Sequence, residues 1–77
     1  MIIDDTRDLR ERLKAERRQL GLTQEELALK AGVGLRFIRD IEQGKQSLRL
    51  DKVNQVLFLF GYRMAPVRIA GEKGIPS

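Results

Sequence analysis

The sequence predicts a small all-α domain of four to five helices that ends in one short β-strand. Its 77 residues are enough for a single domain. Leucine, isoleucine and valine recur at intervals of three and four residues, as on the buried face of an amphipathic helix. Glycine stands where each of these apolar series stops, at Gly21, Gly32, Gly44 and Gly61.

The composition argues against several classes of function. The chain is 42% hydrophobic and 34% charged, a globular balance, and it contains neither cysteine nor histidine. Thiolate metal sites and the commonest general base are therefore missing. We expect no enzyme, no metal and no cofactor. Since no apolar run approaches the roughly 18 residues of a membrane span, we also expect no membrane contact and a cytoplasmic location.

Positive charge is concentrated in the middle and the C-terminal part of the chain. The net charge is −1 over residues 1–29, +3 over residues 30–52 and +2 over residues 53–77. Such a distribution is compatible with a polyanionic partner and equally with an ordinary solvated surface. Charge alone leaves both interpretations open.

The first predicted helix starts near Asp5 or Thr6, either of which can cap it, and stops at Gly21. Its inward stripe consists of Leu9, Leu13, Arg17 and Leu20. A guanidinium on an apolar stripe needs a partner. We expect Arg17 to pair with Glu42 and to have a structural role.

Two short helices follow. The capping box of Thr23 and Glu26 begins a helix from Gln24 to about Ala31. Gly32, Val33 and Gly34 separate it from a third helix, predicted over residues 35–43. The inward positions of the pair are Leu27, Ala31, Ile38 and Ile41, with Phe37 beside them.

The fourth helix is marked by an inward stripe and stops at Gly61. The stripe consists of Leu50, Val53, Val56, Leu57 and Phe60. Residues 62–69 have partly alternating β-type side chains and are interrupted by Pro66, which predicts a short edge strand. The domain is expected to span residues 1–70, and residues 71–77 are expected to form a flexible tail.

The most informative segment is QEELALKAGVGLRFIRDIEQ, residues 24–43. A helix-turn-helix needs two short helices at a steep angle, a small residue at their closest approach and a tight turn. Ala28 and Gly32 supply the last two. A simple helical hairpin has some of these features, whereas all of them at this spacing predict a helix-turn-helix.

LTQEELALKAGV followed by IxxIEQGK resembles the Xre, or lambda-Cro-type, helix-turn-helix repressors over roughly Leu9 to Phe60. The chain is more specifically similar to HipB-like antitoxins, including a rhizobial branch with the pattern GLTQEELA…FIxxIExGK…LRLDKV. The resemblance implies a lambda-repressor-like fold and a homodimer that binds its own palindromic operator and a HipA-like kinase toxin. Gly34 departs from the pattern, which has serine or threonine there, but glycine is an acceptable helix cap.

In such a protein the third helix enters the major groove of double-stranded DNA. Arg36 and Arg39 lie on its outward side and can read guanine or bind phosphate, or simply be solvated. We expect Asp40 to orient one of them and Leu35 to contact a thymine methyl. In the resembled family, Gln24 contacts the DNA backbone. The predicted DNA-binding residues are Gln24, Gly34, Leu35, Arg36, Arg39, Asp40, Lys45, Gln46, Ser47 and Arg49.

Apolar residues outside the stripe of the fourth helix predict a dimer. Phe58 and Leu59 are apolar but do not face the core. We expect a two-fold interface in which the strands of residues 62–69 pair between subunits. The alternative is that the strand folds back over both side chains within one chain. The predicted interface residues are Phe58, Leu59, Tyr62, Met64 and Val67.

Three functions remain open at this point. The first is a repressor that also acts as the antitoxin of a HipA-like toxin. The second is a free-standing Xre regulator from a phage or a restriction-modification operon, without a toxin. The third is a protein-interaction module whose helix-turn-helix does not bind DNA.

Overall fold

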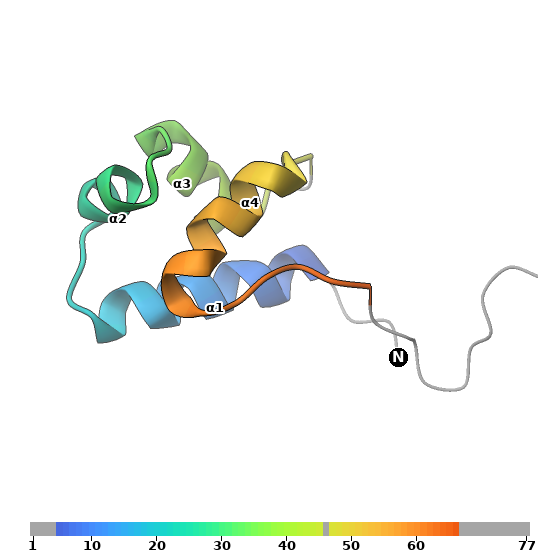
Figure 1. The fold of residues 1–77 in the computed structure, drawn as a ribbon, viewed down its shortest axis with the longest axis horizontal. Helices are drawn as coiled ribbons and strands as arrows, with labels where there is room; N and C mark the ends of the chain where they lie inside the picture. The colour runs from blue at the N-terminus through green and yellow to red at the C-terminus, as the bar shows by residue number, and fades with distance from the viewer. Residues whose placement is uncertain (1–4, 46, 67–77) are drawn as a thin grey trace, which may run out of the picture.

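The computed structural model describes residues 5–45 and 47–66, and this part of the chain is all-helical (Figure 1). Its elements are α1 (Asp5–Gln19), α2 (Gln24–Ala31), α3 (Leu35–Glu42), α4 (Leu50–Leu57) and the 3-10 helix η1 (Phe58–Phe60). The short helices α2 and α3 lie next to each other, α3 also packs against α1, and α4 packs against α2. The predicted all-α class is confirmed. None of the described helices is long and apolar enough to cross a bilayer.

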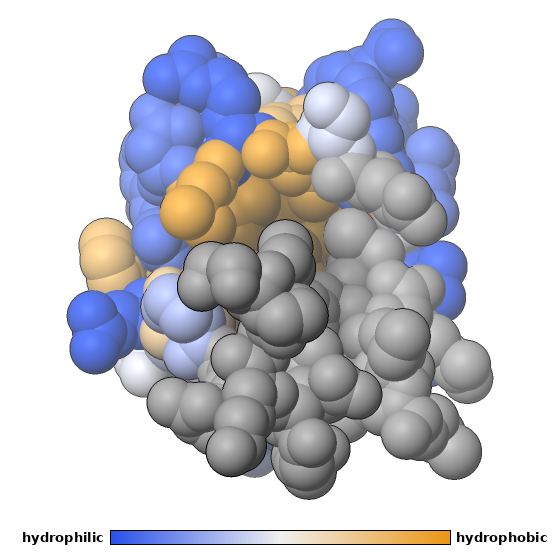
Figure 2. Space-filling model, turned by 90° about the vertical axis from the view of Figure 1, so that its right-hand side faces the viewer, coloured by the Kyte–Doolittle hydropathy of each residue, from blue (hydrophilic) through white to orange (hydrophobic). Residues whose placement is uncertain are grey.

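All four α-helices contribute to one core. Its fully buried side chains are Leu13 from α1, Leu27 from α2, Ile38 and Ile41 from α3, and Val56 from α4. Hydrophobic side chains also lie at the surface, at the end of the molecule where α1 and α4 begin. There, hydrophobic side chains are visible between hydrophilic flanks (Figure 2).

Two leucines predicted to face inward are exposed. Leu20 lies in the turn after α1, because the helix ends at Gln19. Leu50 is the first residue of α4, and Leu48 in the preceding connection packs against the core instead. Helical spacing predicts the face of a helix on which a residue lies. It does not predict whether the helix continues to that residue or whether the core lies beneath it.

The boundaries of α2 are set by local hydrogen bonds. The Thr23 hydroxyl accepts from the Glu26 backbone N–H at 3.0 Å, and a Glu26 carboxylate oxygen accepts from the Thr23 N–H at 2.9 Å. The hydrogen bond from the Thr23 backbone N–H to the carboxylate lowers the pKa of Glu26, and a hydrogen bond with the Thr23 side chain lowers it further. At the other end Gly32 adopts φ +72°, the left-handed conformation that glycine reaches without strain, and the helix stops there.

The chain after η1 runs back along α1 (Figure 1). The Tyr62 hydroxyl donates to a Glu16 carboxylate oxygen at 2.9 Å, and the Met64 backbone N–H donates to the Asn54 side-chain oxygen at 2.6 Å. Residues 62–66 do not form a strand, because no second strand lies beside them among the residues that the structure describes. The expected strand is therefore not found there. Its last residues, 67–69, and the expected tail, 71–77, lie outside the described residues.

Candidate nucleic-acid interface

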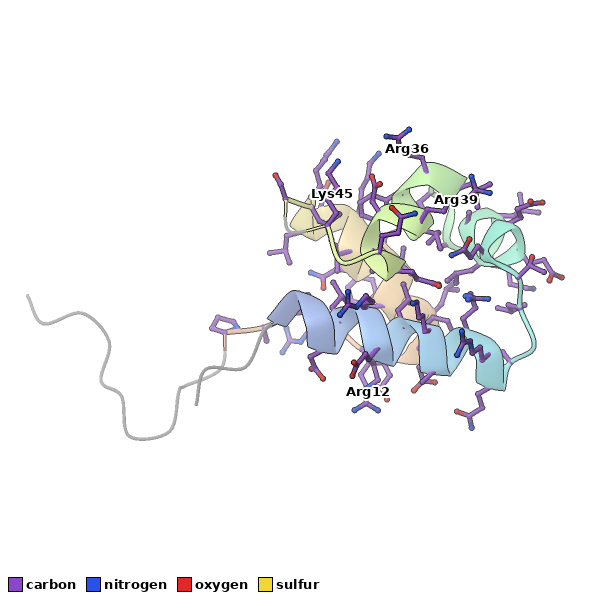
Figure 3. The ribbon with its side chains drawn as sticks, turned by 180° about the vertical axis from the view of Figure 1, so that it is seen from behind. Arg12, Arg36, Arg39 and Lys45 are labelled. Carbon is purple, nitrogen blue, oxygen red and sulfur yellow. The ribbon has the colours of Figure 1, made fainter. Side chains whose placement is uncertain are left out.

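Helix α3 has one face in the core and one face outside. Ile38 and Ile41 are buried, while the side chains of Arg36 and Arg39 are exposed. Arg36, Arg39 and Lys45 lie on the side of the molecule around α3, and Arg12 projects from α1 on the opposite side (Figure 3). The structure therefore places three of the predicted contact residues on one side of the molecule, around the outward face of α3.

An ion pair beneath this face joins α1 to α3. The Nε and Nη2 atoms of Arg17 donate to the two carboxylate oxygens of Glu42 at 2.8 and 3.0 Å. Arg17 Nη1 also donates to the Leu22 carbonyl at 2.9 Å. Glu42 is only 3% exposed. The expected pair is thus formed as a bidentate contact that fixes the end of α3 relative to α1.

Gln24, the first residue of α2, belongs to the same polar group. Its side-chain nitrogen donates to a Glu42 carboxylate oxygen at 3.2 Å. The side chain is half-buried, so it is held at the N-terminus of α2. An amide –NH₂ has two hydrogens, and this bond uses one of them. The contact with Glu42 was not predicted from the sequence.

A second contact missed by the sequence analysis holds the turn between α2 and α3. The side-chain nitrogen of Gln55, on α4, donates to the carbonyls of Ala31 at 2.8 Å and Gly32 at 3.2 Å. These carbonyls end α2 and have no partner within that helix. The end of a helix in the sequence implies that its last carbonyls need a donor. It does not indicate that the donor is Gln55, which lies 24 residues after Ala31.

Two aspartates lie among the outward cations. Asp40 Oδ1 is 3.8 Å from Arg36 Nε, and Asp40 Oδ2 is 3.6 Å from Lys45 Nζ. Asp51 accepts from Arg49 Nη2 at 2.7 Å and from Arg49 Nε at 3.2 Å. The hydrogen bonds from Arg49 lower the pKa of Asp51, so this pair is charged at neutral pH. Three cations of this face are therefore paired within the chain.

The remaining predicted DNA-binding residues have more limited environments. Gly34 caps α3 with its backbone in an extended conformation and makes no side-chain bond. Leu35 is half-buried and packs against the core, which leaves less of it for a thymine methyl. Ser47 is exposed, and Gln46 lies outside the described residues.

The residues predicted for dimerisation differ in exposure. Phe58 is 64% exposed and Leu59 44% exposed, so residues 62–66 do not cover them. Tyr62 lies against α1, with the Arg12 guanidinium carbon 5.7 Å from its ring centre. Met64 packs partly against the core of its own chain. Val67 lies outside the described residues.

Comparison with known proteins bears on this geometry. The model of the helix-turn-helix family HTH_3 matches residues 13–65. An uncharacterized HTH-type transcriptional regulator from Sinorhizobium fredii, y4mF, is 53% identical over 45 residues, which are 58% of this chain and 59% of that protein. The chain thus covers about three fifths of that relative. No solved structure matches the chain.

Proposed function

The chain belongs to the helix-turn-helix family, and from that premise we propose that it is a sequence-specific DNA-binding transcriptional regulator. The observation that carries the proposal is the outward face of α3. Its exposed Arg36 and Arg39 stand on a helix whose opposite side is anchored in the core. Arginine on a groove-sized helix is the commonest reader of guanine in DNA.

In this proposal α3 lies in the major groove and its neighbours hold the DNA backbone. Arg36 and Arg39 face base edges, whereas Lys45, Ser47 and Arg49 follow α3 and lie toward the phosphates. Gln24 contributes an amide hydrogen from the start of α2. Phosphate contacts of this kind position the helix, and base contacts select the sequence.

Substitution of Arg36 by alanine tests the base-reading role. We expect it to lower affinity for a duplex selected by the wild-type chain by about 1–3 kcal/mol and to relax preference at one base pair. Fluorescence anisotropy with the selected duplex and a scrambled duplex measures both effects. The control is Arg12→Ala, which removes the same charge from the opposite side of the molecule (Figure 3). Because Arg12 lies over the Tyr62 ring, light scattering first checks that this variant keeps the wild-type mass. Equal losses on both duplexes for Arg36→Ala would rule out base reading by this residue.

We propose further that the regulator binds a palindromic operator as a homodimer. The exposed Phe58 and Leu59 support this, since two such neighbouring side chains outside the core favour burial against a second copy. In the proposed dimer, Tyr62 and Met64 lie at the border of the interface. The two α3 helices would then be about 34 Å apart, one turn of DNA.

The finer biological role that we propose is that of an antitoxin which binds a HipA-like kinase toxin and represses their shared operon. Its support is the similarity of FIRDIEQGK and LRLDKV to the HipB-like pattern. The alternative is a free-standing regulator, which requires the same DNA-binding face. Co-purification with the product of the adjacent gene distinguishes them: a stable complex supports the antitoxin role, and its absence supports the free-standing regulator.

A further inference from the structure

We infer that Asp40 makes Arg36 selective for guanine, an inference that rests on the proposed DNA-binding function. Asp40 lies one helical turn after Arg36 on the same face of α3. Its Oδ1 atom is 3.8 Å from Arg36 Nε, and its side chain is 20% exposed, whereas that of Arg36 is 90% exposed. A largely buried carboxylate therefore lies beside a guanidinium that projects into solvent.

The atom that faces Asp40 decides which atoms of Arg36 remain for DNA. With Nε toward the carboxylate, Nη1 and Nη2 remain for a partner outside the chain, on a side chain that projects outward (Figure 3). Two parallel donors match the O6 and N7 acceptors of guanine. Adenine offers one acceptor and one donor at the same edge, so it cannot satisfy both arms of the fork. The selected base is therefore guanine.

Asp40 has a second and opposite effect on sequence-independent binding. Its other oxygen lies 3.6 Å from Lys45 Nζ, so the carboxylate that faces Arg36 also faces a cation expected on a phosphate. A negative charge near the DNA backbone weakens binding to every sequence. In the groove, where water is excluded, the attraction between Asp40 and Arg36 becomes stronger than on the free surface.

Asp51 offers a matched comparison within the same chain. It carries the same charge and binds Arg49 at 2.7 and 3.2 Å, but it lies at the start of α4, outside the recognition helix. Arg49 is expected on a phosphate and not on a base. Asp51 therefore competes with DNA for Arg49 and orients no base-reading group.

The test compares Asp40→Asn with Asp51→Asn on three kinds of duplex. These are one selected by the wild-type chain, a series in which each of its G·C pairs is changed in turn to A·T, and a random duplex. Both variants are expected to bind the random duplex several-fold more tightly at low salt. Asp51→Asn strengthens binding to the selected duplex by the same factor and keeps its discrimination. Asp40→Asn loses discrimination at one guanine, from roughly 5- to 150-fold in the wild type toward none.

Arg36→Lys provides a second test, because lysine keeps the charge but has no fork. It is expected to lose the same discrimination, and adding Asp40→Asn to it should cause no further loss. Unchanged guanine discrimination in Asp40→Asn, or an additional loss in the double variant, overturns the inference. A wild-type chain that selects no sequence refutes the proposed function instead, so the two failures are distinguishable. Circular dichroism of each variant confirms that its helices are intact.

Discussion

Replacement of Glu42 by alanine is expected to lower the free energy of unfolding by about 3–5 kcal/mol. Glu42 is 3% exposed and accepts two hydrogen bonds from Arg17 and one from Gln24. Without it, a largely buried guanidinium keeps only the Leu22 carbonyl. Small domains are stable by only about 5–15 kcal/mol, so the variant should be close to unfolding at 37 °C. Urea denaturation followed by circular dichroism measures the change.

A double substitution separates the electrostatic contribution of the ion pair to stability from the contribution of the packing of its side chains. Arg17→Met combined with Glu42→Leu replaces both charges with apolar side chains of similar size. Because no unpaired charge is left, we expect it to recover most of the stability that Glu42→Ala loses. Asp51→Asn, which removes one charge of an exposed pair, should leave the urea midpoint almost unchanged. If Glu42→Ala unfolds at the same urea concentration as the wild type, the pair does not hold α3 on α1.

Substitution of Leu59 by aspartate is expected to convert the proposed dimer into a monomer. The new charge would be placed in the centre of the proposed interface, next to Phe58. Loss of the second half-site then weakens operator binding by roughly 10²- to 10⁴-fold, because the two subunits no longer bind together. Light scattering measures the mass, and circular dichroism should show the helices retained, since Leu59 is not part of the buried core.

Two further variants define what the Leu59 result means. Leu29→Asp places the same charge at another exposed leucine, on α2, and should leave the mass unchanged. Truncation after Gly61 removes the segment of residues 62–69 and should also abolish the dimer. An unchanged dimeric mass for both Leu59→Asp and the truncated chain would contradict the interface.

Local signals in the sequence were sufficient for the helix-turn-helix. The capping box at Thr23 and the left-handed Gly32 fix both ends of α2 within a few residues of chain, and the predicted bounds of α2 and the observed ones agree. The third helix ends at Glu42, one residue before its predicted end, with Gln43 as its cap. The partner of Arg17 could be predicted because a charge on an apolar stripe must be neutralised.

Contacts that depend on how the helices pack could not be predicted in this way. Gln55 reaches carbonyls 23 and 24 residues away, and Gln24 reaches Glu42 across 18 residues. Both are polar side chains at positions that a helical pattern describes only as half-exposed. The exposure of Leu20 and Leu50 has the same origin, because the extent of the core is a property of the assembled helices.

The most direct test of the account is a titration of the wild-type chain with a duplex that it has itself selected and with a scrambled duplex of equal length and composition. A regulator that reads bases through α3 should bind the selected duplex at least about 10³-fold more tightly at physiological salt. Both affinities should fall steeply as salt rises, since phosphate contacts contribute to each. Equal affinity for the two duplexes would contradict the central claim that the exposed face of α3 reads DNA sequence.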